Sequence, residues 1–278
     1  MSEKKLSIDS RVSLSDGNSM PLLGLGTWAA QPGGETRDAV AFALETGYRH
    51  IDTAKMYGNE QDVGEAVRQS SIPRQEIFVT TKLWDSDQGY QTAHDAFDRS
   101  MDQLGLEYID LYLIHWPVEK LRNDSWRALN NIKESGRTRS IGVSNFSHKH
   151  LQELYSHSDI QPVVNQIELS PFLQQPLIVS FCQSENIQLT GYCPLAKGRR
   201  FDEPVLADIA EQHSKSPAQV MIRWALQKRQ AVIPKSSNPK RIVQNADIFD
   251  FQISVDEMVR LDDLDDDSRY CPDPLSMP

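Results

Sequence analysis

The stretch Gly47-Tyr48-Arg49-His50-Ile51-Asp52-Thr53-Ala54-Lys55-Met56-Tyr57-Gly58-Asn59-Glu60 decides the fold of this chain. Residues 49–52 predict a short strand, and a helix is expected to begin after Asn59, a candidate N-cap. Asp52 and Tyr57 therefore share one strand-to-helix loop. A carboxylate and a phenol so placed can carry out proton chemistry only if a partner lowers the pKa of the phenol.

Strand and helix patterns alternate along the rest of the chain. Strands are expected at residues 22–26, 49–52, 77–82, 108–115, 140–143, 163–168, 188–192 and 231–234. Helices are expected at residues 35–46, 60–69, 90–104, 148–157, 177–185, 204–213, 217–228, 239–246 and 255–264. A further helix is expected to carry Trp126, Leu129 and Ile132 and to end at Gly136. Eight strand–helix units joined by right-handed crossovers predict an α/β fold, a (β/α)8 TIM barrel with extra C-terminal helices, and an open doubly wound sheet is the rival. An N-terminal β-hairpin on the turn Asp16-Gly17 would plug one end of the barrel.

Length and composition limit the classes of protein. The 278 residues show no linker and no repeat, so residues 1–278 are expected to form a single domain. The net charge of -10 disfavours nucleic acid and anionic membranes as partners. The three cysteines are scattered and form no CxxC pair, which suggests neither a metal site nor a disulfide framework and fits a reducing cytoplasm. With no secretory signal and no apolar run of about 20 residues, we expect a cytoplasmic monomer.

Two later strands end in ionisable residues. Lys82 lies in Thr80-Thr81-Lys82-Leu83-Trp84, and His115 lies in Leu113-Ile114-His115-Trp116-Pro117. With Asp52, one such group ends each of three consecutive strands, as expected at the mouth of a parallel barrel. Each residue alone has an ordinary explanation, such as a surface ion pair or a hydrogen-bonded core histidine. Together, buried charged groups cost stability unless they are paired, and that cost suggests a use.

Six motifs, in order, resemble the signatures of the aldo-keto reductases. They are Gly47-Tyr48-Arg49-His50-Ile51-Asp52-Thr53-Ala54, Tyr57-Gly58-Asn59-Glu60, Thr81-Lys82-Leu83-Trp84, Ile114-His115-Trp116-Pro117, Gly142-Val143-Ser144-Asn145-Phe146 and Ile233-Pro234-Lys235-Ser236. The match runs over residues 22–245. The resemblance implies NADPH-dependent reduction of aldehydes and ketones to alcohols. The short segments 117–125 and 270–274 are similar to those of compact microbial members, such as 2,5-diketo-D-gluconate and methylglyoxal reductases, which implies small aldehydes, dicarbonyls or keto-sugars as substrates.

The same resemblance assigns the four polar residues catalytic roles. Tyr57 is the general acid that protonates the carbonyl oxygen, and the ammonium of Lys82 lowers its pKa from about 10. Asp52 holds Lys82 charged and oriented. His115 donates to the substrate carbonyl or orients it, so that the developing oxyanion meets donors already in place.

A dinucleotide site is expected on the barrel, because no Rossmann glycine pattern follows any strand. Cations and a serine lie after the last strand, beside a helix start, where an anion is favoured by charge and by the helix dipole; a solvated basic turn is the alternative. The resemblance places the adenosine 2'-phosphate and the adenine on Lys235, Ser236, Arg241 and Asn245. It places the nicotinamide on Ser144, Asn145, Gln166 and Tyr192, each of which has an ordinary structural explanation too.

Three tryptophans follow barrel strands and are candidates for the substrate pocket. Trp28, Trp84 and Trp116 would supply aromatic walls that exclude water, although core packing explains Trp116 equally well. Cys193 stands where the family often has serine, so no reactivity is assumed for it.

Two other functions stay open from the sequence. The barrel also suits an aldolase or isomerase that uses Lys82 or Lys235 as a Schiff-base lysine. A nucleotide-binding regulatory barrel with little turnover is the third hypothesis, although such a protein has no need of Tyr57 and Lys82 together.

Overall fold

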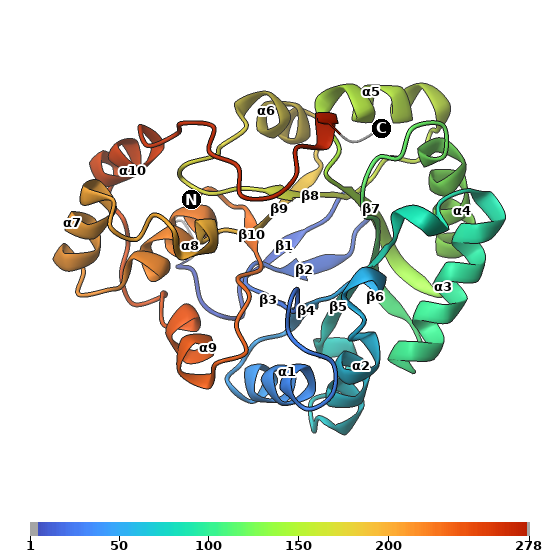
Figure 1. Ribbon diagram of the computed structural model, residues 1–278, viewed down its shortest axis with the longest axis horizontal. Coiled ribbons are helices and arrows are strands. Elements are labelled where there is room, and N and C mark those ends of the chain that lie inside the picture. The colour runs from blue at the N-terminus through green and yellow to red at the C-terminus, as the bar shows by residue number, and fades with distance from the viewer. Residues whose placement is uncertain (1–4, 277–278) are drawn as a thin grey trace.

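A parallel eight-stranded barrel forms the centre of the protein. The computed structural model describes residues 5–276, and helices surround the sheet in that part of the chain (Figure 1). The strands pair in sequence order, and they are β3 (Leu25–Gly26), β4 (His50–Asp52), β5 (Phe78–Leu83), β6 (Ile109–Ile114), β7 (Thr138–Ser144), β8 (Val164–Glu168), β9 (Gln188–Tyr192) and β10 (Ala231–Val232). The predicted (β/α)8 fold is confirmed, and the open sheet is excluded by the closure described next.

The barrel closes between its first and last strands. Parallel bridges join Leu23 to Val232 and Gly26 to Lys235. A Cβ at Gly26 would lie 2.7 Å from the carbonyl oxygen of Ile233, so only glycine permits this approach. The first and last strands are shorter than the expected 22–26 and 231–234, because pairing at this seam is irregular.

Ten α-helices surround the barrel in the described residues. They are α1 (Glu35–Glu45), α2 (Glu60–Gln69), α3 (Tyr90–Leu104), α4 (Arg122–Glu134), α5 (His148–His157), α6 (Pro176–Ser184), α7 (Pro204–Gln212), α8 (Pro217–Gln227), α9 (Pro239–Ala246) and α10 (Val255–Asp262). Their amphipathic spacing explains the close agreement with the predicted ranges. Gly105 ends α3 in the left-handed region at φ 59°, and Ser216 and Gln219 form a capping box on α8.

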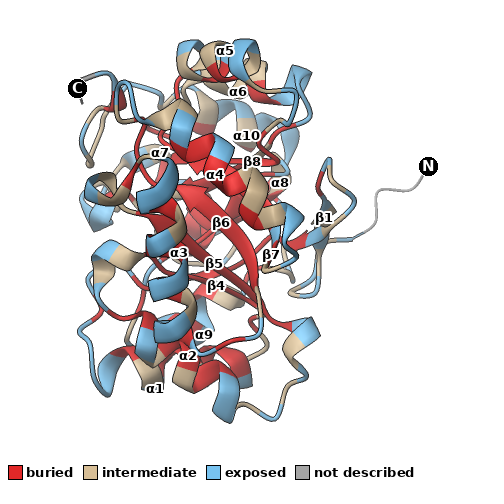
Figure 2. Cartoon of the chain, turned by 90° about the vertical axis from the view of Figure 1, so that its right-hand side faces the viewer, coloured by how far each residue is buried: buried red, intermediate tan, exposed pale blue. Residues whose placement is uncertain are grey.

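Each end of the barrel is covered by a different segment. The hairpin β1 (Arg11–Ser13) and β2 (Ser19–Pro21) lies at the end opposite to the C-terminus (Figure 2). Asp16 accepts a hydrogen bond of 2.9 Å from Ser140 near the start of β7, and Leu14 and Met20 are buried. The hairpin therefore plugs the amino ends of the strands, as expected, and leaves the carboxyl ends for a site.

Asn59 does not cap α2 with its side chain, and that prediction was wrong. The residue is fully buried, and its amide group accepts from Thr53 Oγ1 at 2.7 Å and donates to the Thr27 carbonyl at 3.1 Å. Asn59 thus joins the loops after β3 and β4 instead of satisfying the helix end. None of the described helices is long and apolar enough to cross a membrane.

Candidate active site

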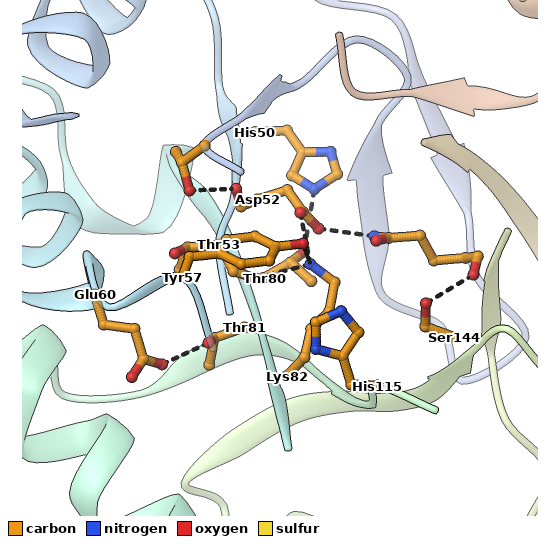
Figure 3. Close-up of polar contacts among 12 residues, drawn as sticks. His50, Asp52, Thr53, Tyr57, Glu60, Thr80, Thr81, Lys82, His115 and Ser144 are labelled. Atoms are coloured by element: carbon orange, nitrogen blue, oxygen red, sulfur yellow. Dashed lines mark hydrogen bonds and ion pairs between the residues drawn. The ribbon is translucent and has the colours of Figure 1, made fainter. Parts of the chain in front are cut away.

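Asp52, Lys82 and Tyr57 meet at the carboxyl ends of β4 and β5. Lys82 Nζ lies 2.6 Å from Asp52 Oδ1, 2.8 Å from the carbonyl oxygen of Thr53 and 3.5 Å from the Tyr57 hydroxyl (Figure 3). Tyr57 stands in the short 3-10 helix Lys55–Tyr57, which Gly58 ends at φ 68°. The loop singled out in the sequence thus turns the phenol back over the lysine from the next strand.

The pair of Asp52 and Lys82 is completely buried. The side chains are 2% and 0% exposed. Burial lowers the pKa of Lys82, and Asp52 opposes that shift both by its charge and by its hydrogen bond. A carboxylate in contact is what keeps an ammonium charged in such a place.

The pKa of Tyr57 is raised well above its usual value of 10. Burial is the largest cause, and the negative charge of Asp52 acts in the same direction. The net shift is thus upward and not downward as expected, because burial outweighs the ammonium of Lys82, which donates to the hydroxyl at 3.5 Å. The phenol is therefore fully protonated at neutral pH, which is the form that a proton donor needs.

His115 completes the group of four from the end of β6. Its ring centroid lies 5.8 Å from that of Tyr57, at an interplanar angle of 75°. Burial, and then the charge of Lys82, lower the pKa of His115 well below 6.5. The imidazole is thus neutral at pH 7 and offers one N–H to a ligand without a positive charge.

Glu60 is a second buried carboxylate near Lys82, and sequence reasoning missed it. It accepts a hydrogen bond of 2.5 Å from Thr81 Oγ1, and burial raises its pKa. Glu60 opens α2 immediately after the loop of Tyr57, and Thr81 precedes Lys82 in β5. Both residues stood inside the quoted motifs, yet only the fold shows that they face each other.

The residues expected around a nicotinamide form one hydrogen-bonded chain that reaches the group of four. Gln166 Nε2 donates to Asp52 Oδ2 at 2.7 Å, and Ser144 Oγ donates to the Gln166 carbonyl at 2.8 Å. Asn145 donates to the His115 carbonyl at 3.0 Å and accepts from the Tyr192 hydroxyl at 2.7 Å. These hydrogen bonds connect the carboxyl ends of β4 and β6–β9 around the group of four.

Two of the three tryptophans lie against His115. Trp84 packs edge-on at 5.3 Å between ring centroids, and Trp116 stacks at 6.4 Å and 20°. Trp116 is 8% exposed, so it belongs largely to the core. Trp28 is 48% exposed on the loop after β3, where Lys197 Nζ lies 5.3 Å from its ring.

The residues expected to hold a phosphate form a separate group after β10, in which the two cations are exposed. Asn238 caps α9 by accepting from the amide of Arg241 at 3.3 Å, and the neighbouring Ser236 is buried. Among the described residues, Arg241 forms no salt bridge, and Lys235 Nζ lies 4.0 Å from Glu35 and 3.4 Å from Ser237 Oγ. Cations left free beside a helix N-terminus fit a phosphate, whereas buried Asn245 lies farther along α9.

A C-terminal segment, residues 266–275, borders the same mouth. It crosses in front of β8 and β9 in Figure 1. Glu168, at the end of β8, accepts the amides of Tyr270 at 2.8 Å and Cys271 at 3.1 Å, and Lys197 donates to the Tyr270 carbonyl at 2.6 Å. Nothing in the sequence marked Glu168 or Cys271, because only the fold brings the tail to the strand ends.

Comparison with protein families gives one extensive match. The model of the Aldo/keto reductase family covers residues 22–266. The 9,11-endoperoxide prostaglandin H2 reductase of Trypanosoma cruzi (strain CL Brener) is 50% identical over 266 residues, which are 95% of this chain and 94% of that protein. The glyoxal reductase of Bacillus subtilis (strain 168) is 45% identical, over 96% of this chain and 97% of that protein.

A solved structure shows the same similarity in three dimensions. The crystal structure of a Gox0644 mutant in complex with NADPH superimposes with a TM-score of 0.92 at 42% sequence identity. The similarity covers 99% of this chain and 100% of that one. The fold and the polar strand ends described above therefore lie within a region that is shared throughout.

Proposed function

Since this chain belongs to the aldo/keto reductase family, we propose that it reduces small aldehydes and dicarbonyl compounds with Tyr57 as the proton donor. The enzyme is an NADP-dependent oxidoreductase that converts carbonyl groups to alcohols. The observation that carries the proposal is the meeting of Asp52, Lys82, Tyr57 and His115 at adjoining strand ends. We propose that residues 1–278 act as one domain, since one connected core runs through the barrel and its helices.

The cofactor is NADP(H), and the residues after β10 fit it. Lys235 and Arg241 are exposed cations with little internal pairing, and the intervening Ser236 is buried. We propose that this group binds the 2'-phosphate, that Asn245 contacts the adenine, and that Ser144, Asn145 and Gln166 hold the nicotinamide end. Tyr192 stacks on its ring. When bound, the reduced nicotinamide supplies the hydride.

The four polar residues divide the work at the carbonyl oxygen. In this proposal the oxygen lies between the Tyr57 hydroxyl and the neutral His115, and both donate hydrogen bonds to it. Negative charge that develops on the oxygen is stabilised by these donors and by the nearby ammonium of Lys82. An alkoxide is a much stronger base than a phenolate, so a high pKa of Tyr57 does not prevent proton transfer to it. Asp52 keeps Lys82 charged throughout.

The pocket wall favours a compact, partly apolar substrate. We propose that Trp28 and Trp84 contact the part of the substrate beyond the carbonyl, and that Trp116 supports His115 from behind. Trp84 packs edge-on against His115, so a substrate bound at His115 would also contact the Trp84 ring. The exposed Trp28 leaves the mouth open, which suits several small carbonyl compounds.

The Schiff-base alternative is disfavoured at Lys82 by burial. Its side chain is 0% exposed, and Nζ already donates to Asp52 and Thr53. A carbonyl carbon cannot reach this nitrogen unless both hydrogen bonds break. Borohydride treatment with an aldehyde should therefore leave the peptide that contains Lys82 unmodified.

A Tyr57→Phe variant tests the proposal. Turnover of small aldehydes such as glyoxal should fall about 10²–10⁴-fold, since the proton donor is lost, while the Kd for NADPH stays within about twofold. Tyr90→Phe is the matched control, because Tyr90 is exposed on α3 and its hydroxyl donates a hydrogen bond to Asn131. Unchanged turnover in Tyr57→Phe would remove Tyr57 from the reaction.

The regulatory alternative gives a different result in the same experiment. A nucleotide-binding barrel would bind NADPH and show no turnover with any member of a panel of aldehydes, dicarbonyls and keto-sugars. Comparing NADPH with NADH across that panel measures the contribution of the phosphate group, and we expect NADPH to be preferred by at least about tenfold in kcat/KM.

A further inference from the structure

Cys193, Cys271 and Glu168 form a cluster that carbonyl reduction does not use. The two sulfur atoms and a Glu168 carboxylate oxygen all lie within 4.8 Å of one another. Cys193 immediately follows β9, and Glu168 ends β8, which pairs with β9 in register at Tyr192. Cys271 belongs to the C-terminal segment, so the fold alone unites these residues.

The position of Cys271 is fixed by its own backbone. Both oxygens of Glu168 accept amide hydrogens from the segment, one from Tyr270 at 2.8 Å and the other from Cys271 at 3.1 Å. Lys197, four residues after Cys193, holds the Tyr270 carbonyl at 2.6 Å. These three hydrogen bonds hold Tyr270 and Cys271 against the end of β8 and against the loop after β9. They therefore keep the thiol of Cys271 close to that of Cys193.

The two thiols are chemically unequal. A hydrogen bond from Cys271 lowers the pKa of Cys193, and the same bond raises the pKa of Cys271. Both residues are partly exposed, so small oxidants can reach them. An accessible thiolate beside a second thiol is the arrangement of an oxidisable pair. Cys182, in contrast, is buried, and burial raises its pKa to about 11.

We propose that Cys193 and Cys271 form a reversible disulfide that fixes the C-terminal segment across the mouth of the barrel and slows turnover. The oxidant is a low-molecular-weight disulfide. The Cys193 thiolate attacks one of its sulfur atoms, a mixed disulfide forms, and the first thiolate leaves. Cys271 then loses its proton and attacks the sulfur of Cys193, which releases the second thiol. Two protein thiols are oxidised, and one small disulfide is reduced to two thiols.

The effect on turnover follows from what the segment borders. Cys193 directly follows Tyr192, the proposed nicotinamide-stacking residue, and the amide of Cys271 donates to Glu168, which pairs with Tyr192 across β8 and β9. A ligand stacked on Tyr192 would lie beside the segment, and release steps that require such a segment to move often limit kcat. This part of the inference rests on the proposed function.

Metal binding is a less favourable role for the same cluster than disulfide formation. Glu168 already accepts one backbone hydrogen bond on each oxygen, so it is a poor third ligand, and a structural zinc site takes four. Two thiols that contact each other and lack two further ligands favour oxidation over metal binding.

The test uses the full chain in glutathione buffers of graded oxidation, followed by alkylation and mass spectrometry. We expect a species about 2 Da lighter, with the Cys193 and Cys271 peptides cross-linked and Cys182 alkylated after unfolding. Cys271→Ser should stop at one glutathione adduct on Cys193. Cys182→Ala is the control and should still form the cross-link. A wild-type protein that carries only mixed disulfides, or stoichiometric Zn²⁺ that protects both thiols while no cross-link forms, would overturn the proposal.

Turnover supplies the second readout. Oxidation should lower kcat at least about threefold in the wild type, reversibly with dithiothreitol, and leave Cys193→Ser unaffected. A cross-linked protein with full kcat would refute the regulatory part. Failure of the proposed reductase function is distinguishable, because the mass measurement needs no activity.

Discussion

Two ion pairs, one fully and one largely buried, lie near opposite ends of the barrel, and only one of them borders the proposed ligand site. Asp52 and Lys82 meet at 2.6 Å at the carboxyl ends of β4 and β5. Arg74 and Asp110 meet at 2.7 Å near the amino ends of β5 and β6. Burial raises the pKa of Asp110, and Arg74 opposes that shift. Both pairs pay for desolvation with contact and with further hydrogen bonds.

The difference lies in what surrounds each pair. Asp110 also accepts the amide of Val79 at 2.9 Å, and Arg74 donates to the carbonyl oxygens of Tyr108 and Ile77, so the further hydrogen bonds of this pair go to the backbone. Lys82 instead touches the Tyr57 hydroxyl, with neutral His115 beside it. A buried ion pair is therefore no mark of catalysis by itself. A neighbouring proton donor that can reach a ligand is what distinguishes the two ends.

The largest effect that tests this comparison is expected from Lys82→Met. Turnover should fall at least about 10³-fold, because the charge beside the developing oxyanion is lost, and Asp52 is left buried without its partner. The free energy of unfolding should fall by about 3–5 kcal/mol. Steady-state assays and denaturant titrations measure both. Near-normal turnover in the folded variant would erase the distinction between the two pairs.

Arg74→Met is the matched change at the opposite end. Its cost in unfolding free energy should be about 3 kcal/mol, near the lower limit for a buried pair, because Arg74 is 19% exposed. The turnover number of the folded protein should stay within about twofold of the wild type. A loss of turnover comparable to that of Lys82→Met would show that the amino end also acts on the chemistry.

A pH titration of stability sharpens the comparison with a third buried group. Burial lowers the pKa of His50 to about 4 although Asp52 lies near, and its Nε2 lies 3.1 Å from Thr80 Oγ1. The unfolded state binds a proton below about pH 6.5 and the folded state does not until about pH 4. Stability is therefore complete above pH 6.5 and is lost as the pH falls toward 4, by about 3 kcal/mol.

The measurement compares unfolding free energies of the wild type and His50→Gln at pH 7 and pH 4. The wild type should lose about 3 kcal/mol more than the variant, since glutamine does not titrate. His157→Gln is the control, because His157 is exposed and should leave the pH dependence of the wild type intact. Equal losses in all three proteins would mean that His50 is not the group responsible.

The smallest effect is expected at the exposed cations. Arg241→Ala should raise the Kd for NADPH about tenfold, leave kcat within about twofold and weaken the salt dependence of binding. Arg127→Ala, an exposed cation on α4 whose side chain is 64% accessible, should change none of these. Equal Kd values for NADPH and NADH in the wild type would contradict the phosphate assignment at its root.

Much of the architecture was predictable because it is local. The helices at 60–69, 90–104, 148–157 and 239–246 were placed to the residue, since apolar spacing and glycine or proline stops define them. The three polar strand ends and the nearby Tyr57 were also found, because a parallel barrel places the ends of consecutive strands together. The monomeric state and the cytoplasmic location stay predictions.

What sequence reasoning missed depends on distance through space. The pKa of Tyr57 rises because burial and the charge of Asp52 outweigh the hydrogen bond that its hydroxyl accepts from Lys82. The side chain of Asn59 joins two loops that come close only after the barrel closes. The sequence does not indicate that Cys193 and Cys271 are neighbours, because they are far apart along the chain. They meet only because the segment after α10 returns to the mouth of the barrel.

The seam between β3 and β10 has a consequence for ligand binding. Only a few hydrogen bonds hold the first and last strands of the barrel together. One of them runs from the Gly24 amide to the Val232 carbonyl at 2.9 Å. Trp28 follows one of these strands, and Lys235 follows the other. A dinucleotide and substrate bound across the mouth would contact both sides of this seam and oppose the separation of β3 from β10. Hydrogen exchange at Gly24 and Gly26 should therefore slow when NADPH binds, more than at the paired interior of β6.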